Sequence, residues 1–249
     1  MPRGMKFLLL FLLGWYLGPS LGYAGRPLFT EDTGTTDKGT FELELALDYL
    51  QEDNRDKYFI PIAQLAYGLT ERIEIAASVE YIFWNIHDGD REDGWGDVNV
   101  YFKYRVWDEG KFHPAFAFKP LIKIPTANEN KDLGSGKTDY GLTAIFSKSF
   151  GSWNIDFDAS SLFVGENHKP DILSAGLAAE YEVKKGLRAV GEVRYGNNFN
   201  SDDKDDPAFI LFGFQSEMGS AIFDAGLNMG LNNAAPDYGF TLGVTLQFK

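Results

Sequence analysis

Residues 238–248 read Tyr-Gly-Phe-Thr-Leu-Gly-Val-Thr-Leu-Gln-Phe. Every second residue is apolar or aromatic, and the residues between them are glycine, threonine or glutamine. A period of two is typical of a β-strand with one apolar and one polar face. The end of the chain therefore predicts a two-faced strand, with an aromatic residue, Phe248, one position before the final Lys249.

The same alternation recurs towards the start of the chain. Its clearest further examples are residues 41–49, 73–83, 98–106, 116–124, 155–163, 173–181 and 187–195. Weaker examples are near residues 57–67, 138–149, 208–217 and 221–231. Together with residues 238–248 these segments predict about twelve strands, an even number, as bacterial barrels require.

The predicted connections between strands alternate in length. Six are long and polar, near residues 52–56, 86–93, 126–137, 166–171, 197–207 and 232–237. Five are short, near residues 68–71, 108–111, 151–152, 184–186 and 218–220. Outer-membrane barrels keep short turns in the periplasm and long loops outside, so both termini are predicted to be periplasmic.

The strands of a soluble β-sandwich also alternate between apolar and polar residues. The chemistry of the two strand faces therefore has to distinguish a sandwich from a membrane barrel. The polar face is rich in opposite charges, as in a water-filled lumen. The apolar face ends repeatedly in aromatic residues that fit an interfacial girdle: Tyr49, Phe83, Phe163, Tyr195 and Phe248. We therefore predict an all-β fold, a transmembrane antiparallel up-and-down β-barrel of about twelve strands in residues 39–249.

The start of the chain has the pattern of a signal peptide. Arg3 and Lys6 precede a short apolar run, and Gly22-Tyr23-Ala24 offers small residues for cleavage, so residues 1–24 are predicted to be removed. Residues 25–38 then form a periplasmic segment or a small plug. The predicted location is the outer membrane of a Gram-negative bacterium, where lipid and lipopolysaccharide are partners and the barrel-assembly machinery reads the last strand.

Composition excludes several classes of function. The chain has no cysteine, which excludes disulfides and thiol chemistry. It has 36 acidic and 23 basic residues and a net charge of −13, so nucleic acid is not an expected partner.

Charged residues on the predicted inner face form two candidate groups. A lumen basic wall comprises Lys103, Arg105, Lys119 and Lys123. Lumen acidic walls comprise Glu42, Glu44, Asp48, Asp156, Asp158, Glu180 and Glu182. Two interpretations stay open: ion pairs that stiffen a narrow barrel, or a transverse field that orients a polar permeant.

A further group of acids lies near the starts of predicted strands, after the long loops. These outer rim acids are Asp97, Asp139, Asp171, Asp206 and Asp237. Asp and Gly favour tight bends, so one interpretation is that these acids serve only to form turns. The alternative is an acidic rim that attracts divalent cations.

No catalytic residue, metal site or cofactor is predicted. The stretch Gly134-Ser135-Gly136-Lys137-Thr138 resembles a phosphate loop, but Lys131 stands where that motif needs glycine and a strand pattern follows. His87, His113 and His168 fall in connections at opposite rims, which does not fit a Ser-His-acid site. An envelope lipid hydrolase is thus disfavoured, and we predict that the chain is not an enzyme.

Three segments resemble a known family. They are residues 26–34 with 39–44, residues 94–98 (Gly-Trp-Gly-Asp-Val), and residues 124–127 (Ile-Pro-Thr-Ala) followed by 134–141. The chain is similar there to the outer-membrane family labelled "putative MetA-pathway of phenol degradation". The resemblance implies a transporter-like barrel over residues 25–249 and carries no catalytic residues.

Two functional hypotheses follow. The first is an outer-membrane channel or facilitator for a small-molecule permeant, including hydrophobic or aromatic compounds. The second is a non-conducting structural or surface-binding barrel in which residues 26–38 close the lumen.

Overall fold

The computed structural model describes residues 25–52, 55–86, 91–131, 133–165, 171–197 and 206–249; the predicted signal peptide lies outside them. The strands in this part are β1 (Phe41–Glu52), β2 (Arg55–Thr70), β3 (Ile73–Ile86), β4 (Arg91–Trp95), β5 (Val98–Trp107), β6 (Ala115–Ile124), β7 (Asp139–Phe150), β8 (Trp153–Phe163), β9 (Ile172–Lys184), β10 (Leu187–Gly196), β11 (Ala208–Met218), β12 (Ala221–Gly230) and β13 (Tyr238–Phe248). A single 3-10 turn, η1 (Glu129–Lys131), accompanies them.

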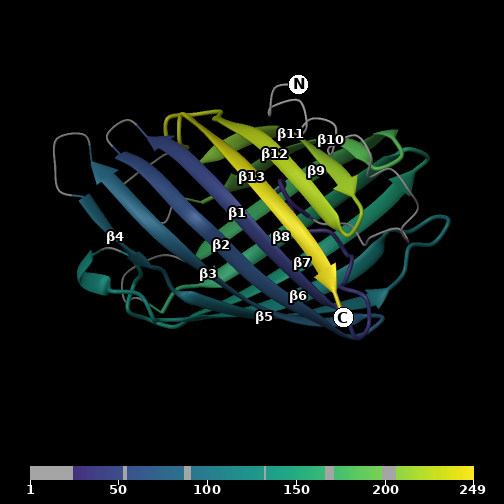
Figure 1. The fold of residues 1–249 in the computed structure, drawn as a ribbon, viewed down its shortest axis with the longest axis horizontal. Coiled ribbons are helices and arrows are strands. Elements are labelled where there is room, and N and C mark those ends of the chain that lie inside the picture. Colours follow the sequence, from purple (N-terminus) through teal and green to yellow (C-terminus); the bar gives the residue numbers. More distant parts are fainter. Residues whose placement is uncertain (1–24, 53–54, 87–90, 132, 166–170, 198–205) are drawn as a thin grey trace, which may run out of the picture.

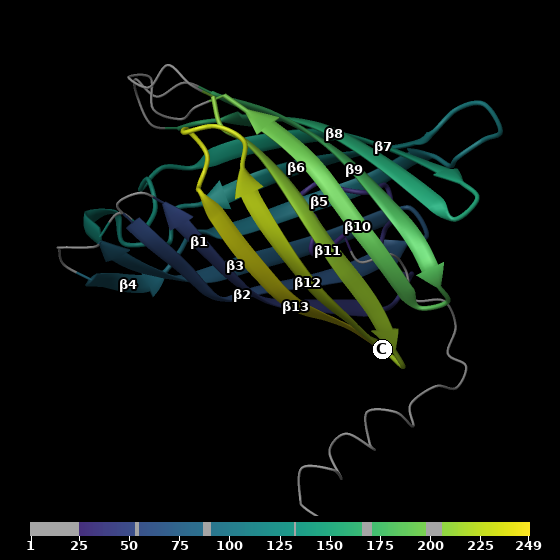
Figure 2. The same ribbon diagram turned by 90° about the horizontal axis from the view of Figure 1, so that it is seen from above.

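Twelve of these strands form a closed antiparallel ring. Each pairs with the ring strands before and after it, and β13 pairs with β1 from Phe41↔Phe248 to Gln51↔Tyr238. In Figure 1, β2, β1 and β13 cross the near face side by side, and Figure 2 shows the same tilted strands turned by 90°. The predicted up-and-down barrel is confirmed.

One strand was not predicted. Residues 91–95, placed in and beside a long loop by the sequence pattern, form β4. The reason is the length of β3: its first part, Ile73 to Ser78, pairs with β5 within the ring, whereas Tyr81 to Asn85 extend past β5 and pair with β4. The overhanging part of β3 would otherwise have an unpaired edge.

Side chains alternate across the barrel wall as the sequence indicates. On β12 the inward Asp224 and Asn228 are each 6 % exposed, whereas the outward Leu227 is 63 % exposed. Large apolar side chains cover the outside of other strands too, among them Leu142, Phe157, Leu177, Phe212 and Leu242. An apolar outer surface and a polar interior are suited to lipid outside and water inside. No helix in the described ranges is long and apolar enough to cross a membrane.

The two ends of the barrel differ. The connections at residues 71–72, 151–152, 185–186 and 219–220 have two residues each, and they lie at the end that also holds the C-terminus. The longer connection at residues 125–138 lies at the opposite end, with β4. We refer to these as the short-turn end and the long-loop end. Which side of the membrane each end faces stays a prediction.

Candidate functional site

Residues 25–38 enter the ring at the short-turn end and contact its inner wall. This stretch has no strand or helix, so its backbone N–H groups need other acceptors. Acidic side chains of the wall supply them. Thr36 N donates to Glu74 Oε2 at 2.6 Å on β3, and Thr30 N donates to Glu192 Oε2 at 2.8 Å on β10. Glu31 N donates to Asp158 Oδ2 at 2.9 Å on β8.

The first charged side chain of this segment, Arg26, points at acids on β1 and β12. Its Nη2 lies 2.9 Å from Asp48 Oδ1 on β1, and its Nε lies 3.7 Å from Asp224 Oδ1 on β12. It also donates to Thr241 on β13. Because the Asp224 side chain is only 1 % exposed, the guanidinium compensates a carboxylate that water barely reaches.

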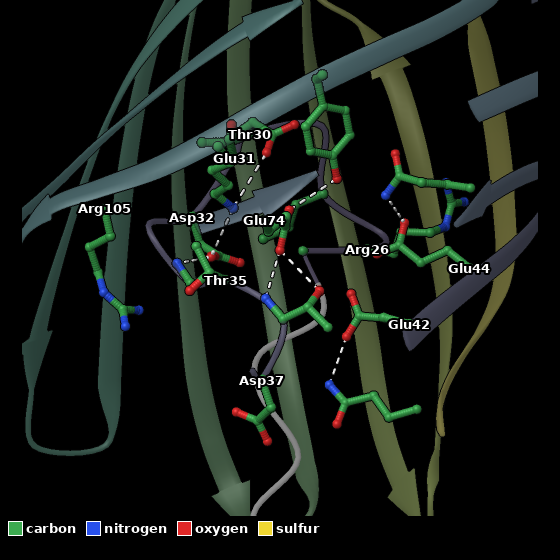
Figure 3. Close-up of a pocket in the computed structure, with 18 of the residues that line it drawn as sticks. Arg26, Thr30, Glu31, Asp32, Thr35, Asp37, Glu42, Glu44, Glu74 and Arg105 are labelled. Atoms are coloured by element: carbon green, nitrogen blue, oxygen red, sulfur yellow. Dashed lines mark hydrogen bonds and ion pairs between the residues drawn. The ribbon is translucent and has the colours of Figure 1, made fainter. Parts of the chain in front are cut away.

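Two acids of the segment face the basic strands. Lys119 Nζ on β6 donates to Glu31 Oε1. Lys103 Nζ on β5 lies 3.8 Å from Glu31 Oε2 and 3.6 Å from Asp32 Oδ1. Burial raises the pKa of Glu31, but Lys119, Lys103 and Arg194 together outweigh burial and hold that pKa at about 2. Figure 3 shows the Glu31 and Asp32 side chains with their dashed contacts.

The wall is also shaped to the segment. A Cβ atom at Gly176 on β9 would lie 2.3 Å from Thr30 Oγ1, and one at Gly213 on β11 would lie 2.8 Å from Pro27 Cγ. Glycine at both positions therefore permits a close approach. Leu28 adds to this contact with the wall by packing on three buried residues, Ala178, Val190 and Leu211.

At least two cavities lie beside the segment. The larger, about 390 Å³, lies between the segment and strands β1, β2, β3, β5 and β13. In it Gln64 donates to Glu44 Oε2 at 3.0 Å, and Gln247 donates to Glu42 Oε2 at 2.7 Å, as Figure 3 shows. The smaller cavity, about 210 Å³, is lined by Thr33, Arg105, Asp108, Ser147 and Asn154, among others. The lumen beside the segment is thus lined by hydrogen-bonding groups.

The residues grouped as a basic wall separate into three places. Lys103 and Lys119 contact the segment, as described. Arg105 lies nearer the short-turn end, where its Nε is 3.1 Å from Asp108 Oδ1. Lys123 lies towards the long-loop end.

The residues grouped as acidic walls divide likewise. Asp48 and Asp158 contact the segment, and Asp158 also lies 3.1 Å from Arg194 Nη1. Asp156 accepts a hydrogen bond from Asn154 at 2.7 Å, and Glu180 is 2 % exposed. Glu182 is exposed near the end of β9. Glu42 and Glu44 line the larger cavity.

The outer rim acids do not form one surface. Asp97 and Asp139 are 7 % and 3 % exposed, and both approach Lys123 Nζ, at 3.2 and 2.6 Å. Asp97 Oδ1 also accepts the backbone N–H of Thr126 and of Ala127. These contacts hold residues 125–131 and 133–138 against the long-loop end, with Leu133 buried on Ile82.

The other three rim acids lie at connections. Asp171 is exposed and accepts the N–H of Val164 at 3.1 Å. Asp206 accepts from the Tyr195 hydroxyl, and Asp237 is exposed.

Sequence reasoning did not single out five residues that hold the segment: Glu74, Glu192, Arg194, Asp224 and Thr241. Each lies on the polar face of its strand, so the alternation places it in the lumen. No local pattern, however, distinguishes it from the other polar residues on that face. His113 contacts the carbonyl oxygen of Pro114 at 3.1 Å, whereas His87 and His168 lie outside the described residues. Within the described part no group of three or more His, Asp or Glu residues could hold a metal ion.

A sequence profile of the family described as "Putative MetA-pathway of phenol degradation" matches residues 24–248. The chain belongs to this family. The resemblance seen in three segments of the sequence therefore extends over the whole barrel of this family member. No curated protein is detectably similar to it in sequence.

Solved structures with the same fold are outer-membrane barrels. The COG4313 outer membrane channel from Pseudomonas putida F1 has a TM-score of 0.73 at 14 % identity, covering 94 % of this chain and 100 % of that chain. The NanC porin has a TM-score of 0.58 at 12 % identity, covering 82 % of this chain and 98 % of the porin. The family member therefore has the fold of an outer-membrane β-barrel, with an apolar outer face.

Proposed function

We propose that the chain is a channel or facilitator that passes small molecules across the outer membrane. The observation that carries this proposal is a closed ring with lipid-facing apolar side chains outside and a polar, hydrogen-bonding wall inside, beside which cavities of about 390 and 210 Å³ remain. The similarity in fold to the COG4313 channel supports it. The family's description supports small aromatic compounds as the permeant class.

The same contacts support a second role, for residues 25–38. The segment is held by wall residues on β1, β3, β5, β6, β8, β10, β12 and β13. These partners lie on eight of the twelve ring strands, so the segment crosses the lumen. We infer that it is a plug, and that the barrel is narrow or closed while the plug is in place.

Two partners belong to this proposal. The outer face would contact lipid and, in the outer leaflet, lipopolysaccharide. The last strand, β13, would be read by the barrel-assembly machinery. Phe248 is 47 % exposed at its end and stacks on Phe41 with ring centroids 5.8 Å apart.

An envelope hydrolase gains no support from the described residues, since His113 contacts a backbone carbonyl and not a serine hydroxyl.

The test compares the mature barrel with a variant that lacks residues 26–38. Conductance is recorded in planar bilayers, and uptake of a small aromatic solute is measured in proteoliposomes. We expect measurable flux from the wild type and a several-fold higher conductance from the deletion, because the wall residues would then face water. Absence of both conductance and flux in the two proteins would refute the channel. Equal conductance would refute the plug alone.

A further inference from the structure

The Glu31 carboxylate lies between two lysines that belong to neighbouring strands of the wall. Lys119 Nζ donates to Oε1, and Lys103 Nζ lies 3.8 Å from Oε2. The side chains of Lys103 and Lys119 are 7 % and 12 % exposed, so both ammonium groups have lost most of their water. Cations buried to this degree require an anion nearby. Within the segment Glu31 supplies that anion to Lys119.

Asp32 does not replace Glu31 at this position. Its Oδ1 lies 3.6 Å from Lys103 Nζ, whereas Lys119 forms its ion pair with Glu31. If the segment moved away, Lys119 would lose Glu31, and Lys103 would lose both Glu31 and Asp32. The attraction that these cations exert on Glu31 is strong, as its pKa of about 2 indicates.

The surroundings of the two lysines indicate which anion fits. Lys119 Nζ lies 4.1 Å from the centroid of the Tyr101 ring, so an aromatic surface borders the site. The 390 Å³ cavity, lined by Lys103 and Tyr101, gives room for the body of a small molecule. Glu42, Glu44 and Glu74 line the same cavity and would repel a second negative charge.

From this geometry we propose that Lys103 and Lys119 form a subsite for small organic monocarboxylates, and that Glu31 occupies it as an internal substitute for the ligand. The proposal deepens the channel function and rests on residues 25–38 being displaceable. A permeant carboxylate would compete with Glu31 for Lys119 and thereby favour release of the segment.

The test is a calorimetric titration of benzoate into the full-length mature barrel in detergent. The Glu31→Gln variant keeps the size of the side chain but removes its charge. We expect it to bind benzoate at least tenfold more tightly than the wild type does. The double variant Glu31→Gln/Lys119→Met should lose that gain. Benzyl alcohol, which has the ring without the carboxylate, should bind all of these proteins equally.

Glu92→Gln is the matched control. It makes the same change from carboxylate to amide in an exposed ion pair with Lys131, and Glu92 on β4 does not line the cavity. This variant should bind benzoate as the wild type does. The variant lacking residues 26–38 exposes the same lysines and should also bind benzoate more tightly than the wild type does, so the test does not depend on one variant folding.

Two results would overturn the subsite: equal benzoate binding by wild type, Glu31→Gln and the deletion, or a gain that survives Lys119→Met. Because binding is measured in detergent, it is independent of transport. Tight binding without any flux would refute the channel, and flux without benzoate binding would refute the subsite.

Discussion

At the scale of single residues, Lys123 has the contacts of a structural clamp. Its Nζ lies 2.6 Å from Asp139 Oδ2 and 3.2 Å from Asp97 Oδ2. Lys123→Met would leave two buried carboxylates without their cation, so we expect the free energy of unfolding to fall by about 3–5 kcal/mol. Denaturant titration of the barrel in lipid vesicles, followed by tryptophan fluorescence, measures this loss.

The control for that variant is Lys131→Met. Lys131 forms an ion pair of 3.0 Å with Glu92, but both side chains are more than 40 % exposed. An exposed pair of this kind contributes about 0–1 kcal/mol. If the two variants cost the same, the clamp at Lys123 would be disproved.

The sequence placed Lys123 in the lumen basic wall and Asp97 and Asp139 among the outer rim acids, but it could not pair them. Alternation predicts which face a side chain lies on, whereas its depth and partner depend on neighbouring strands. Asp97 and Asp139 were therefore considered for a cation-attracting rim, although in the structure both are buried and share one lysine.

At the scale of elements, the strands were predictable because lipid and lumen impose opposite chemistry on alternate residues. The strand β4 was not, since its pairing depends on β3 extending past β5. The path of residues 25–38 through the lumen could not be predicted from the sequence either. This segment has no periodicity, and its partners, from Asp48 to Thr241, are spread over the whole chain.

The lipid-facing assignment predicts how strands respond to charge. Phe212 lies in the middle of β11 and is 56 % exposed on the outer face. Phe212→Arg should lower the free energy of unfolding in vesicles by about 2–4 kcal/mol, because arginine at the bilayer midplane is costly. Leu231→Arg, at a residue 55 % exposed just after β12, should cost only about 0–1 kcal/mol. Equal costs would show that the outer face does not lie in hydrocarbon.

At the scale of the whole molecule, the lumen charges and the N-terminal segment compensate each other. Arg26 lies against acids on one side of the ring, and Glu31 and Asp32 lie against lysines on the other. The transverse field considered from the sequence is thus opposed by the chain's own segment. No strand pair of the ring includes a residue of the segment, so we expect that the segment can leave without breaking the ring.

That independence predicts how the barrel behaves on detergent gels. A closed ring has no edge strand from which unfolding can begin, so the unheated protein should resist detergent and migrate differently from the boiled protein. Removing residues 238–249 deletes β13, which pairs with both β1 and β12, and should abolish the difference in migration. Removing residues 26–38 leaves every ring pair intact and should preserve it. If the second deletion also abolished the heat-dependent shift, the segment would be part of the fold and could not act as a displaceable plug.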